Sequence, residues 1–316
     1  MMDVLNPDYS RRRFIRGVAS GIGALAITPS FAGIGDMEQS ITILHTNDVH
    51  SHLDPFPANH PKYAGMGGSE ARAKLISALK ADDPELLLLD AGDMFQGTPY
   101  YNYFKGVPEL KIMNLLGYDA GTLGNHEFDN GTSGLASVIP IAKFPILNCN
   151  YGLEGTELKG LIKPYQIFKR KGLRIGVFGL GINLQGLVDR KLSGNVVYYK
   201  AEVAAQETSK MLKVEKKCDL VICLSHIGFQ YSGNQISDLR LARMSEHIDI
   251  IIGGHTHTFL DEPVIELNSK GKKVLVSQAG WAGLRLGKIS VKFAKESKEK
   301  MELTGTVMEF KKTSAK

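Results

Sequence analysis

Short, mostly apolar runs recur along the chain. Runs of this kind are typical of strands that are buried on both faces of a sheet. They occupy residues 41–46, 85–89, 120–123, 145–148, 219–224 and 248–252. The pattern therefore predicts a set of buried strands that are joined by longer connections.

The intervals between these runs contain apolar residues at helical spacing. This spacing predicts helices over residues 69–80, 107–116 and 202–218. Pro108 falls in the first turn of the second of these helices, and Gly117 follows its last residue. Both positions suit a helix that begins and ends there.

The last part of the chain is rich in β-forming residues, and an earlier pair of runs reads as a hairpin. The hairpin is predicted over 165–168 and 174–180, and the later strands over 265–267, 273–278, 287–293 and 303–310. Buried βαβ strands followed by further strands suit an α/β fold. We therefore expect a four-layer α/β/β/α sandwich with two mixed β-sheets.

The composition is that of an ordinary globular protein, with 43% apolar and 22% charged residues among 316. No linker interrupts the pattern, so we expect a single domain over residues 40–316. The formal net charge is +5. Four Arg residues lie in the first 32 positions, so the remainder is only mildly basic. This charge predicts no nucleic-acid partner and no association with anionic membranes after processing.

Residues 1–32 have the pattern of an export signal. Arg11 and Arg12 are paired before the apolar residue Ile15, and a short, mildly apolar segment follows. Small residues then lead to a predicted cleavage after Ala32. These features predict a twin-arginine signal peptide, a bacterial protein that is exported folded, and a location in the periplasm or cell exterior.

Side chains that bind metals follow five of the predicted strands. They comprise two Asp, one Asn and four His residues, namely Asp48, His50, Asp93, Asn125, His226, His255 and His257. This set is large enough to hold two cations that share one carboxylate. Mixed imidazole and oxygen ligands suit Zn, Mn, Fe or Co, and the absence of thiolates argues against a structural zinc site.

Two of these donor pairs are spaced i, i+2. In extended backbone, side chains two positions apart point to the same side. Asp48 with His50, and His255 with His257, would then each deliver two ligands to one place at a strand's carboxyl end. Gly253 and Gly254 allow a tight turn or a close backbone approach before the second pair.

The blocks around these donors resemble the calcineurin-like metallophosphoesterases. The order and spacing of all five blocks carry the resemblance. Their flanks are closer to the bacterial 5′-nucleotidase branch, and the similar segments are residues 44–48, 90–93, 124–129, 278–280 and 286–287. The resemblance covers residues 41–293 and implies dependence on two divalent metal ions.

The resemblance also assigns roles, position by position. One metal would be bound by Asp48, His50, Asp93 and His257, and the other by Asp93, Asn125, His226 and His255. His126 and Asp129 would form a catalytic dyad outside the metal ligands. Asp129 follows His126 by about one helical turn, so it can orient the imidazole and raise its pKa.

Three further residues are candidates for contact with substrate. Gln96 and Thr98 come just after Asp93, and a structural role in the loop is equally open for both. Trp281 is the only Trp, and it could stack on a nucleobase or serve in packing. The residue pattern does not choose between these alternatives.

We therefore expect a phosphohydrolase that acts on phosphomonoesters, with nucleotides as the substrate class. A metal-bound hydroxide would attack phosphorus in line while His126 assists the leaving group. The resemblance covers only the first half of two-domain nucleotidases, whose second domain binds the substrate. Four alternatives stay open: the catalytic half of a split nucleotidase with a separate substrate-domain protein, a phosphodiesterase for cyclic nucleotides or nucleotide sugars, a hydrolase of sulfur compounds, and a non-catalytic scaffold.

Overall fold

Two six-stranded mixed sheets carry the fold in this computed structural model, which describes residues 37–294 and 297–310. The first sheet has the order β14-β13-β1-β2-β3-β4. Its strands are β1 (Met37–Thr46), β2 (Leu87–Asp90), β3 (Ala120–Thr122), β4 (Ile146–Leu147), β13 (Arg285–Ala294) and β14 (Ser297–Glu309).

The second sheet has the order β11-β12-β10-β9-β7-β6. Its strands are β6 (Tyr165–Arg170), β7 (Leu173–Gly181), β9 (Leu220–His226), β10 (Ile250–Gly253), β11 (Val264–Leu267) and β12 (Lys273–Ser277). The predicted hairpin is confirmed as the antiparallel pair β6 and β7. A further two-stranded sheet joins β5 (Tyr151–Gly152) to β8 (Val197–Tyr198).

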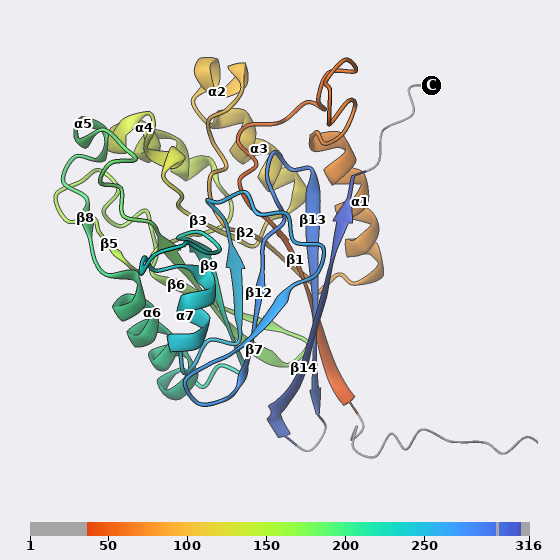
Figure 1. The fold of residues 1–316 in the computed structure, drawn as a ribbon. Helices are drawn as coiled ribbons and strands as arrows, with labels where there is room; N and C mark the ends of the chain where they lie inside the picture. Colours follow the sequence, from red (N-terminus) through yellow and green to blue (C-terminus); the bar gives the residue numbers. More distant parts are fainter. Residues whose placement is uncertain (1–36, 295–296, 311–316) are drawn as a thin grey trace, which may run out of the picture. The chain divides into compact units, whose positions relative to one another are not determined.

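The central strands of each sheet are parallel. In the first sheet, Ile43 of β1 is paired with Leu87 of β2, while β13 runs antiparallel to β1. In the second, Ile222 of β9 lies between Val177 of β7 and Ile250 of β10. The carboxyl ends of these parallel strands lie at the upper edge in Figure 1. The strand ends and loops at this edge carry the metal-binding side chains predicted from the sequence.

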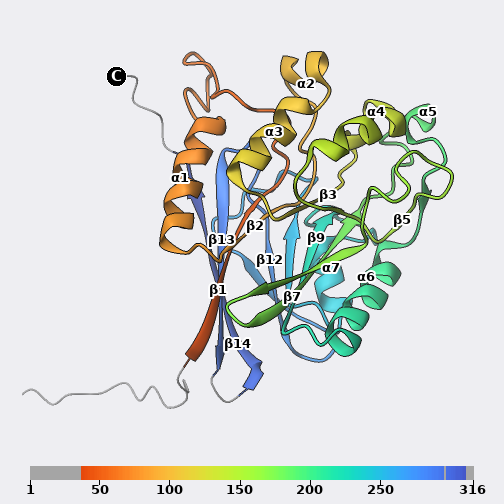
Figure 2. The same cartoon turned by 180° about the vertical axis from the view of Figure 1, so that it is seen from behind.

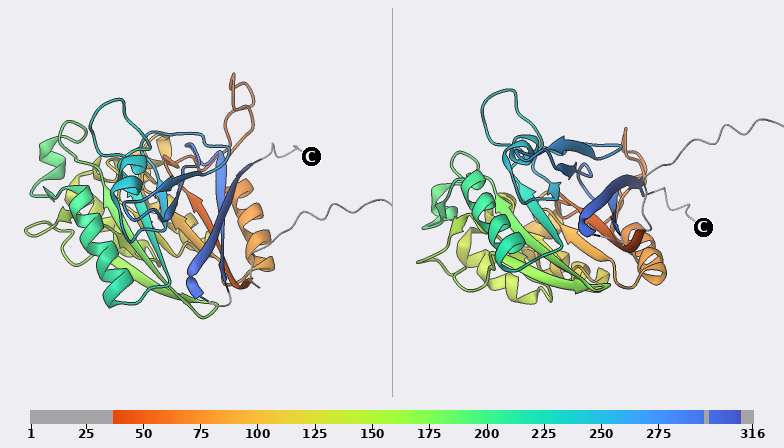
Figure 3. Two further views of the ribbon diagram at one scale, coloured as in Figure 1. Left: turned by 60° about the horizontal axis from the view of Figure 1, so that its bottom comes forward. Right: turned by 90° about the horizontal axis from the view of Figure 1, so that it is seen from below.

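The inner faces of the two sheets pack against each other, and helices cover the outer faces. Ile43 and Leu87 belong to the fully buried inner core together with Val177, Ile222 and Ile250. The first sheet is covered by α1 (Ser69–Asp82), α3 (Val107–Leu116) and α4 (Gly131–Val138), and the second by α6 (Ala201–Lys210) and α7 (Asp238–Met244). Figures 2 and 3 show both helical layers, which confirm the predicted four-layer α/β/β/α sandwich.

The helices differ from the prediction in two respects. The helix predicted over 202–218 ends as an α-helix at Lys210 and continues as the π-helical segment η4 (Met211–Glu215). Short helices lie in segments where none was predicted, because few residues carry the helical period there; these are α2 (Pro99–Phe104), α4, α5 (Arg190–Ser193), α7 and the 3₁₀ turns η2 (His126–Phe128) and η3 (Ile139–Ile141).

The predicted signal peptide, residues 1–32, lies outside the described residues, so it stays a prediction. The domain boundary at residue 40 likewise stays a prediction. Within the described part of the chain, none of the helices has the length and apolar character needed to cross a membrane.

Candidate metal centre

Loops from both sheets bring the seven predicted metal donors to one place. From the first sheet, Asp48 and His50 follow β1, Asp93 follows β2, and Asn125 follows β3. The remaining donors come from the second sheet, where His226 ends β9 and the His255/His257 pair follows β10. The donor atoms of Asp48, His50 and His257 lie within 4.8 Å of one another, as do those of Asp93, His226 and His255.

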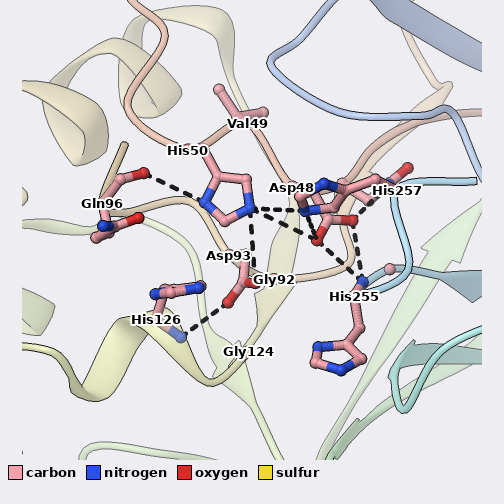
Figure 4. Close-up of polar contacts among 12 residues, drawn as sticks. Asp48, Val49, His50, Gly92, Asp93, Gln96, Gly124, His126, His255 and His257 are labelled. Atoms are coloured by element: carbon pink, nitrogen blue, oxygen red, sulfur yellow. Dashed lines mark hydrogen bonds and ion pairs between the residues drawn. The ribbon is translucent and has the colours of Figure 1, made fainter. Parts of the chain in front are cut away.

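The first donor group centres on the imidazole of His50. Its Nε2 lies 2.9 Å from Nε2 of His257, 3.9 Å from Oδ1 of Asp48 and 3.8 Å from Oδ2 of Asp93. Nε2 of His257 is in turn 3.4 Å from Oδ1 of Asp48. Figure 4 shows these side chains pointing toward a common point.

The second donor group lies on the other side of Asp93. Nε2 of His226 is 3.0 Å from Oδ2 of Asp93 and 3.9 Å from Oδ1 of Asp48. Nδ1 of His255 lies 2.9 Å from the amide oxygen of Asn125. Asp93 therefore faces both groups, which is the position expected of a carboxylate shared by two cations.

The protonation of His226 tests whether these residues suit a cation. Its Nδ1 donates to the carbonyl oxygen of Ala91 over 2.7 Å, so Nδ1 carries a hydrogen. Nε2 is buried and, among the described residues, has no hydrogen-bond partner of good geometry, although Oδ2 of Asp93 faces it. A nitrogen lone pair and a carboxylate oxygen attract each other only with a proton or a metal ion between them.

His50 is held in the same manner. Its Nδ1 donates to the carbonyl oxygens of Phe95 and Gln96 over 3.3 and 3.2 Å, which leaves Nε2 to face the carboxylates.

Without a cation, a proton lies between Nε2 of His226 and Asp93. Burial lowers the pKa of His226, but the charge of Asp93 raises it to about 10. The donor set therefore fits divalent metal ions of the kind that imidazole and carboxylate ligands bind.

The backbone at the donors corrects one prediction. The i, i+2 pairs were expected to converge through extended backbone, and this expectation was wrong. Positive φ angles of 49° to 74° occur at Asp48, His50, Asp93, His255 and His257. Residues other than Gly adopt this region rarely, and they do so when the surroundings impose it.

Hydrogen bonds between loops impose this backbone. The N–H of Asp48 donates to the carbonyl oxygen of Gly92 over 2.9 Å, and that of His50 to the carbonyl oxygen of Asp93 over 3.0 Å. The carboxylate of Asp48 accepts the N–H of His255 from the other sheet over 2.9 Å. The pairs converge because neighbouring loops hold each other in the left-handed region.

Two glycines allow the close approach of backbone to donor side chains. A Cβ at Gly124 would overlap Oδ1 of Asp93 and would lie 2.7 Å from Nε2 of His226. A Cβ at Gly254 would lie 2.8 Å from Nδ1 of His226 and 3.1 Å from Oδ2 of Asp48. The predicted role of Gly254 in a close backbone approach is confirmed.

Glu127 is a buried residue whose role at this centre was missed. Its carboxylate accepts backbone N–H groups from Gly124, Asp93, Met94 and Phe95, over 2.6 to 3.3 Å. These bonds fix the loop of Asp93 against the turn that carries Asn125 and His126. The signal was present in the block 124–129, but the partners are backbone groups that sequence spacing does not reveal.

Two other polar residues support the donor loops. Asn47 donates to Oδ2 of Asp48 and to the carbonyl oxygen of Gly280, both over 2.6 Å, and it accepts the N–H of Ala279 over 2.8 Å. Asp90 accepts the N–H of Gly92 over 2.9 Å. Asn47 therefore joins the loop after β1 to the loop after β12, and Asp90 fixes the residue before Asp93.

His126 and Asp129 are in contact, as the sequence predicted. Nδ1 of His126 lies 2.8 Å from Oδ2 of Asp129, and this hydrogen bond raises the pKa of His126. The backbone N–H of His126 donates to Oδ1 of Asp93 over 2.9 Å. The ring is 34% exposed and that of His257 is 40% exposed, so the centre is open to solvent on this side.

The candidate substrate contacts differ in their surroundings. The backbone carbonyl oxygen of Gln96 accepts a hydrogen bond from His50. The hydroxyl of Thr98 donates to the carbonyl and hydroxyl oxygens of Ser51 over 2.8 and 2.9 Å. The hydroxyl of Thr98 is thus engaged within the loops. Trp281 stacks on the ring of His257, with centroids 5.6 Å apart and an interplanar angle of 6°. Trp281 therefore borders the centre.

A sandwich of two mixed sheets with clustered His, Asp and Asn donors at one edge defines a class of metal-dependent phosphoesterases. Residues 41–259 match the sequence model of the family described as calcineurin-like phosphoesterase. The chain belongs to this family. Its members depend on metals, which agrees with the donor groups described above.

Proteins named 5′-nucleotidase are similar to most of the chain. A snake venom 5′-nucleotidase from Naja atra is 34% identical over 82% of this chain and 51% of its own length. A probable 5′-nucleotidase from Treponema pallidum is 33% identical over 89% of this chain and 49% of its own. The chain thus spans about half the length of these relatives.

The fold is similar to that of a solved 5′-nucleotidase structure. The crystal structure of a 5′-nucleotidase precursor from Thermus thermophilus superposes with a TM-score of 0.77 and 32% sequence identity. The superposition covers 86% of this chain and 54% of that chain. The recognition of a calcineurin-like domain of the 5′-nucleotidase branch is confirmed.

Proposed function

We propose that this protein hydrolyses phosphomonoesters, with nucleotides as the substrate class, at a centre of two divalent cations. The arrangement of the two donor groups around Asp93 carries the proposal. Oδ2 of Asp93 lies 3.8 Å from Nε2 of His50 in one group and 3.0 Å from Nε2 of His226 in the other. Membership of the calcineurin-like phosphoesterases supports the same reaction class.

The ligand assignment follows the two groups. One cation would be held by Asp48, His50, Asp93 and His257, and the other by Asp93, Asn125, His226 and His255. Zn, Mn, Fe or Co suit this set. Two such ions, when bound, would ionise a water molecule near neutral pH and neutralise charge on the phosphoryl oxygens.

His126 is the proposed general acid. Asp129 holds its Nδ1–H, so Nε2 stays available to the substrate side of the ring. The Asp129 hydrogen bond raises the pKa of His126, which favours the protonated ring that a general acid requires. As an oxygen from water bonds to phosphorus and the bond between phosphorus and the leaving oxygen breaks, His126 donates this proton and the alcohol departs.

The names of the relatives support nucleotides as substrates. Because the chain spans about half of those relatives, we keep a second candidate, in which this chain is the catalytic half of a split nucleotidase and a separate protein supplies the substrate domain. Cyclic nucleotides and nucleotide sugars remain alternative substrates of the same centre.

A metal-reconstituted activity panel tests the proposal. The panel comprises 5′-nucleotides, 2′,3′-cyclic nucleotides, nucleotide sugars and aryl phosphates, each assayed with Zn, Mn, Fe or Co and again with EDTA. We expect EDTA-sensitive release of phosphate, strongest with 5′-nucleotides. His247→Ala is the matched control, because His247 is a partly exposed histidine that contacts Glu246 and no donor residue.

The outcomes separate the candidates. Turnover that appears only after a second protein is added supports the split enzyme. Absence of hydrolysis of every substrate in the panel, with metals bound, contradicts the hydrolase proposal and leaves a non-catalytic scaffold.

We also propose that residues 1–32 direct export by the twin-arginine route, on the sequence pattern alone. Replacing Arg11 and Arg12 together by Lys should leave uncleaved protein in the cytoplasm. Unaltered export of that variant contradicts the proposal.

A further inference from the structure

A groove of about 580 Å³ is formed by the loop after β1 and by helix α2. Five of its eleven lining residues carry aromatic rings, and these are His52, Phe56, Tyr100, Tyr103 and Phe104. A volume of this size lies within the range of small-molecule sites. The groove contains none of the seven proposed metal donors.

The groove begins next to the candidate metal centre. His52 lines it, and Nδ1 of His52 donates to the carbonyl oxygen of His50 over 2.9 Å. The rings of His52 and Trp281 form a T-shaped pair with centroids 5.4 Å apart, and Trp281 stacks on His257. Two ring contacts therefore connect the groove to a proposed metal ligand.

Two aromatic side chains of the groove are largely exposed, and a third is packed against a neighbouring ring. Phe56 stacks on His52, with centroids 4.9 Å apart and an interplanar angle of 29°. On α2, Tyr103 is 80% exposed and Phe104 is 54% exposed. Exposed rings gathered in one groove are typical of binding sites rather than of a protein surface that contacts only water.

One polar pair lies among these rings. The hydroxyl of Tyr100 donates to Oδ2 of Asp54 over 2.8 Å, and both residues line the groove. A carboxylate accepts hydrogen bonds but cannot donate them. A ligand that presents N–H groups at this position is therefore favoured over one that presents carbonyl oxygens.

We propose that the groove binds the nucleobase of a nucleoside monophosphate whose phosphoryl group lies at the metal centre. This inference rests on the proposed function. Any nucleobase can stack on an aromatic side chain, because every base has a π face. Asp54 adds a preference for bases with an exocyclic amino group.

The ratio of kcat/KM for AMP to kcat/KM for ribose 5-phosphate isolates the contribution of the base. In Tyr103→Ala and in Phe104→Ala, we expect kcat/KM for AMP to fall by about 5-fold to 100-fold. Ribose 5-phosphate lacks a base, so its kcat/KM should stay within about twofold. The matched control is Tyr199→Ala, because Tyr199 is 55% exposed and does not line the groove.

The pair CMP and UMP tests Asp54 separately. The two bases have the same size, but cytosine presents an amino group where uracil presents a carbonyl oxygen. We expect the native protein to favour CMP and Asp54→Ala to reduce the ratio of CMP to UMP turnover. An unchanged ratio overturns the proposed preference for amino-bearing bases.

The outcomes for the groove and for the reaction are distinguishable. If AMP and ribose 5-phosphate are both hydrolysed and no groove variant alters their ratio, the base site is overturned and the hydrolase stands. If neither is hydrolysed, this chain alone does not hydrolyse these two substrates, and calorimetry with AMP decides the groove: weaker binding by Tyr103→Ala than by the native protein supports it, and equal binding overturns it.

Discussion

The backbone of His126 fixes Asp93, and its ring lies beside the proposed metal donors, with a nitrogen within 4.8 Å of donor atoms of His50 and Asp93. The N–H of His126 donates to Asp93, while the ring bonds to Asp129. Removing the ring therefore leaves the bond that positions Asp93. At the scale of single residues, the proton donor and the metal donors are separable by mutation.

His126→Ala should lower kcat by about 100-fold or more, because the leaving oxygen loses its general acid. Metal content should stay unchanged. Steady-state kinetics and elemental analysis of the same preparation check both expectations. Undiminished turnover would remove His126 from the mechanism, and loss of metal would make it a ligand.

At the scale of elements, the loops after β2 and β3 are packed so closely that only Gly fits at position 124. A methyl group there would overlap Oδ1 of Asp93. Glu127 holds the same two loops together through four backbone N–H groups. The position of Asp93 thus depends on a glycine and a carboxylate that bind no metal in the proposed scheme.

Gly124→Ala should displace Asp93 and so lower metal occupancy at both proposed sites, while the fold is retained. Gly233→Ala is the matched control, because no atom lies within 4 Å of a Cβ at Gly233. Metal titration and circular dichroism of both variants check this. Equal, full occupancy in the two variants would contradict the proposed bridging position of Asp93.

Much of this arrangement could be predicted from the sequence, and the remainder has a physical reason. Apolar runs predicted the strands, and ligand side chains at their carboxyl ends predicted the cluster. The left-handed backbone of Asp48 could not be predicted, because it depends on the carbonyl oxygen of Gly92 in another loop. Likewise, Glu127 bonds to the N–H of Asp93, 34 positions away, and no spacing rule marks such a pair.

At the scale of the whole described unit, the metal donors join the two sheets. Asp48 and His50 follow strand β1 of the first sheet. In the second sheet, His226 is the last residue of β9, and His257 lies in the loop after β10. The inner core also joins the sheets, through fully buried aliphatic side chains. Bound cations would therefore add to the packing that holds the sheets face to face.

Removal of the metals should lower the melting temperature, because cations that bind only the folded state stabilise it by mass action. The gain is about 2.7 kcal/mol when the free metal is at 100 times its dissociation constant. Thermal unfolding with saturating metal and with EDTA measures the difference. Asn125→Ala, which lacks one proposed ligand, should show a smaller difference; an identical shift in that variant would contradict the role of Asn125.

The span of the donors along the chain has a consequence for biosynthesis. Asp48 leaves the ribosome long before His257. Strand β1 pairs with β13, so Ile43 can pair with Ile289 only after β13 has been synthesised. A nascent chain that ends before these residues holds neither a finished first sheet nor a full ligand set. Under the proposed ligand assignment, the complete ligand set would therefore exist only after residue 257 has been synthesised.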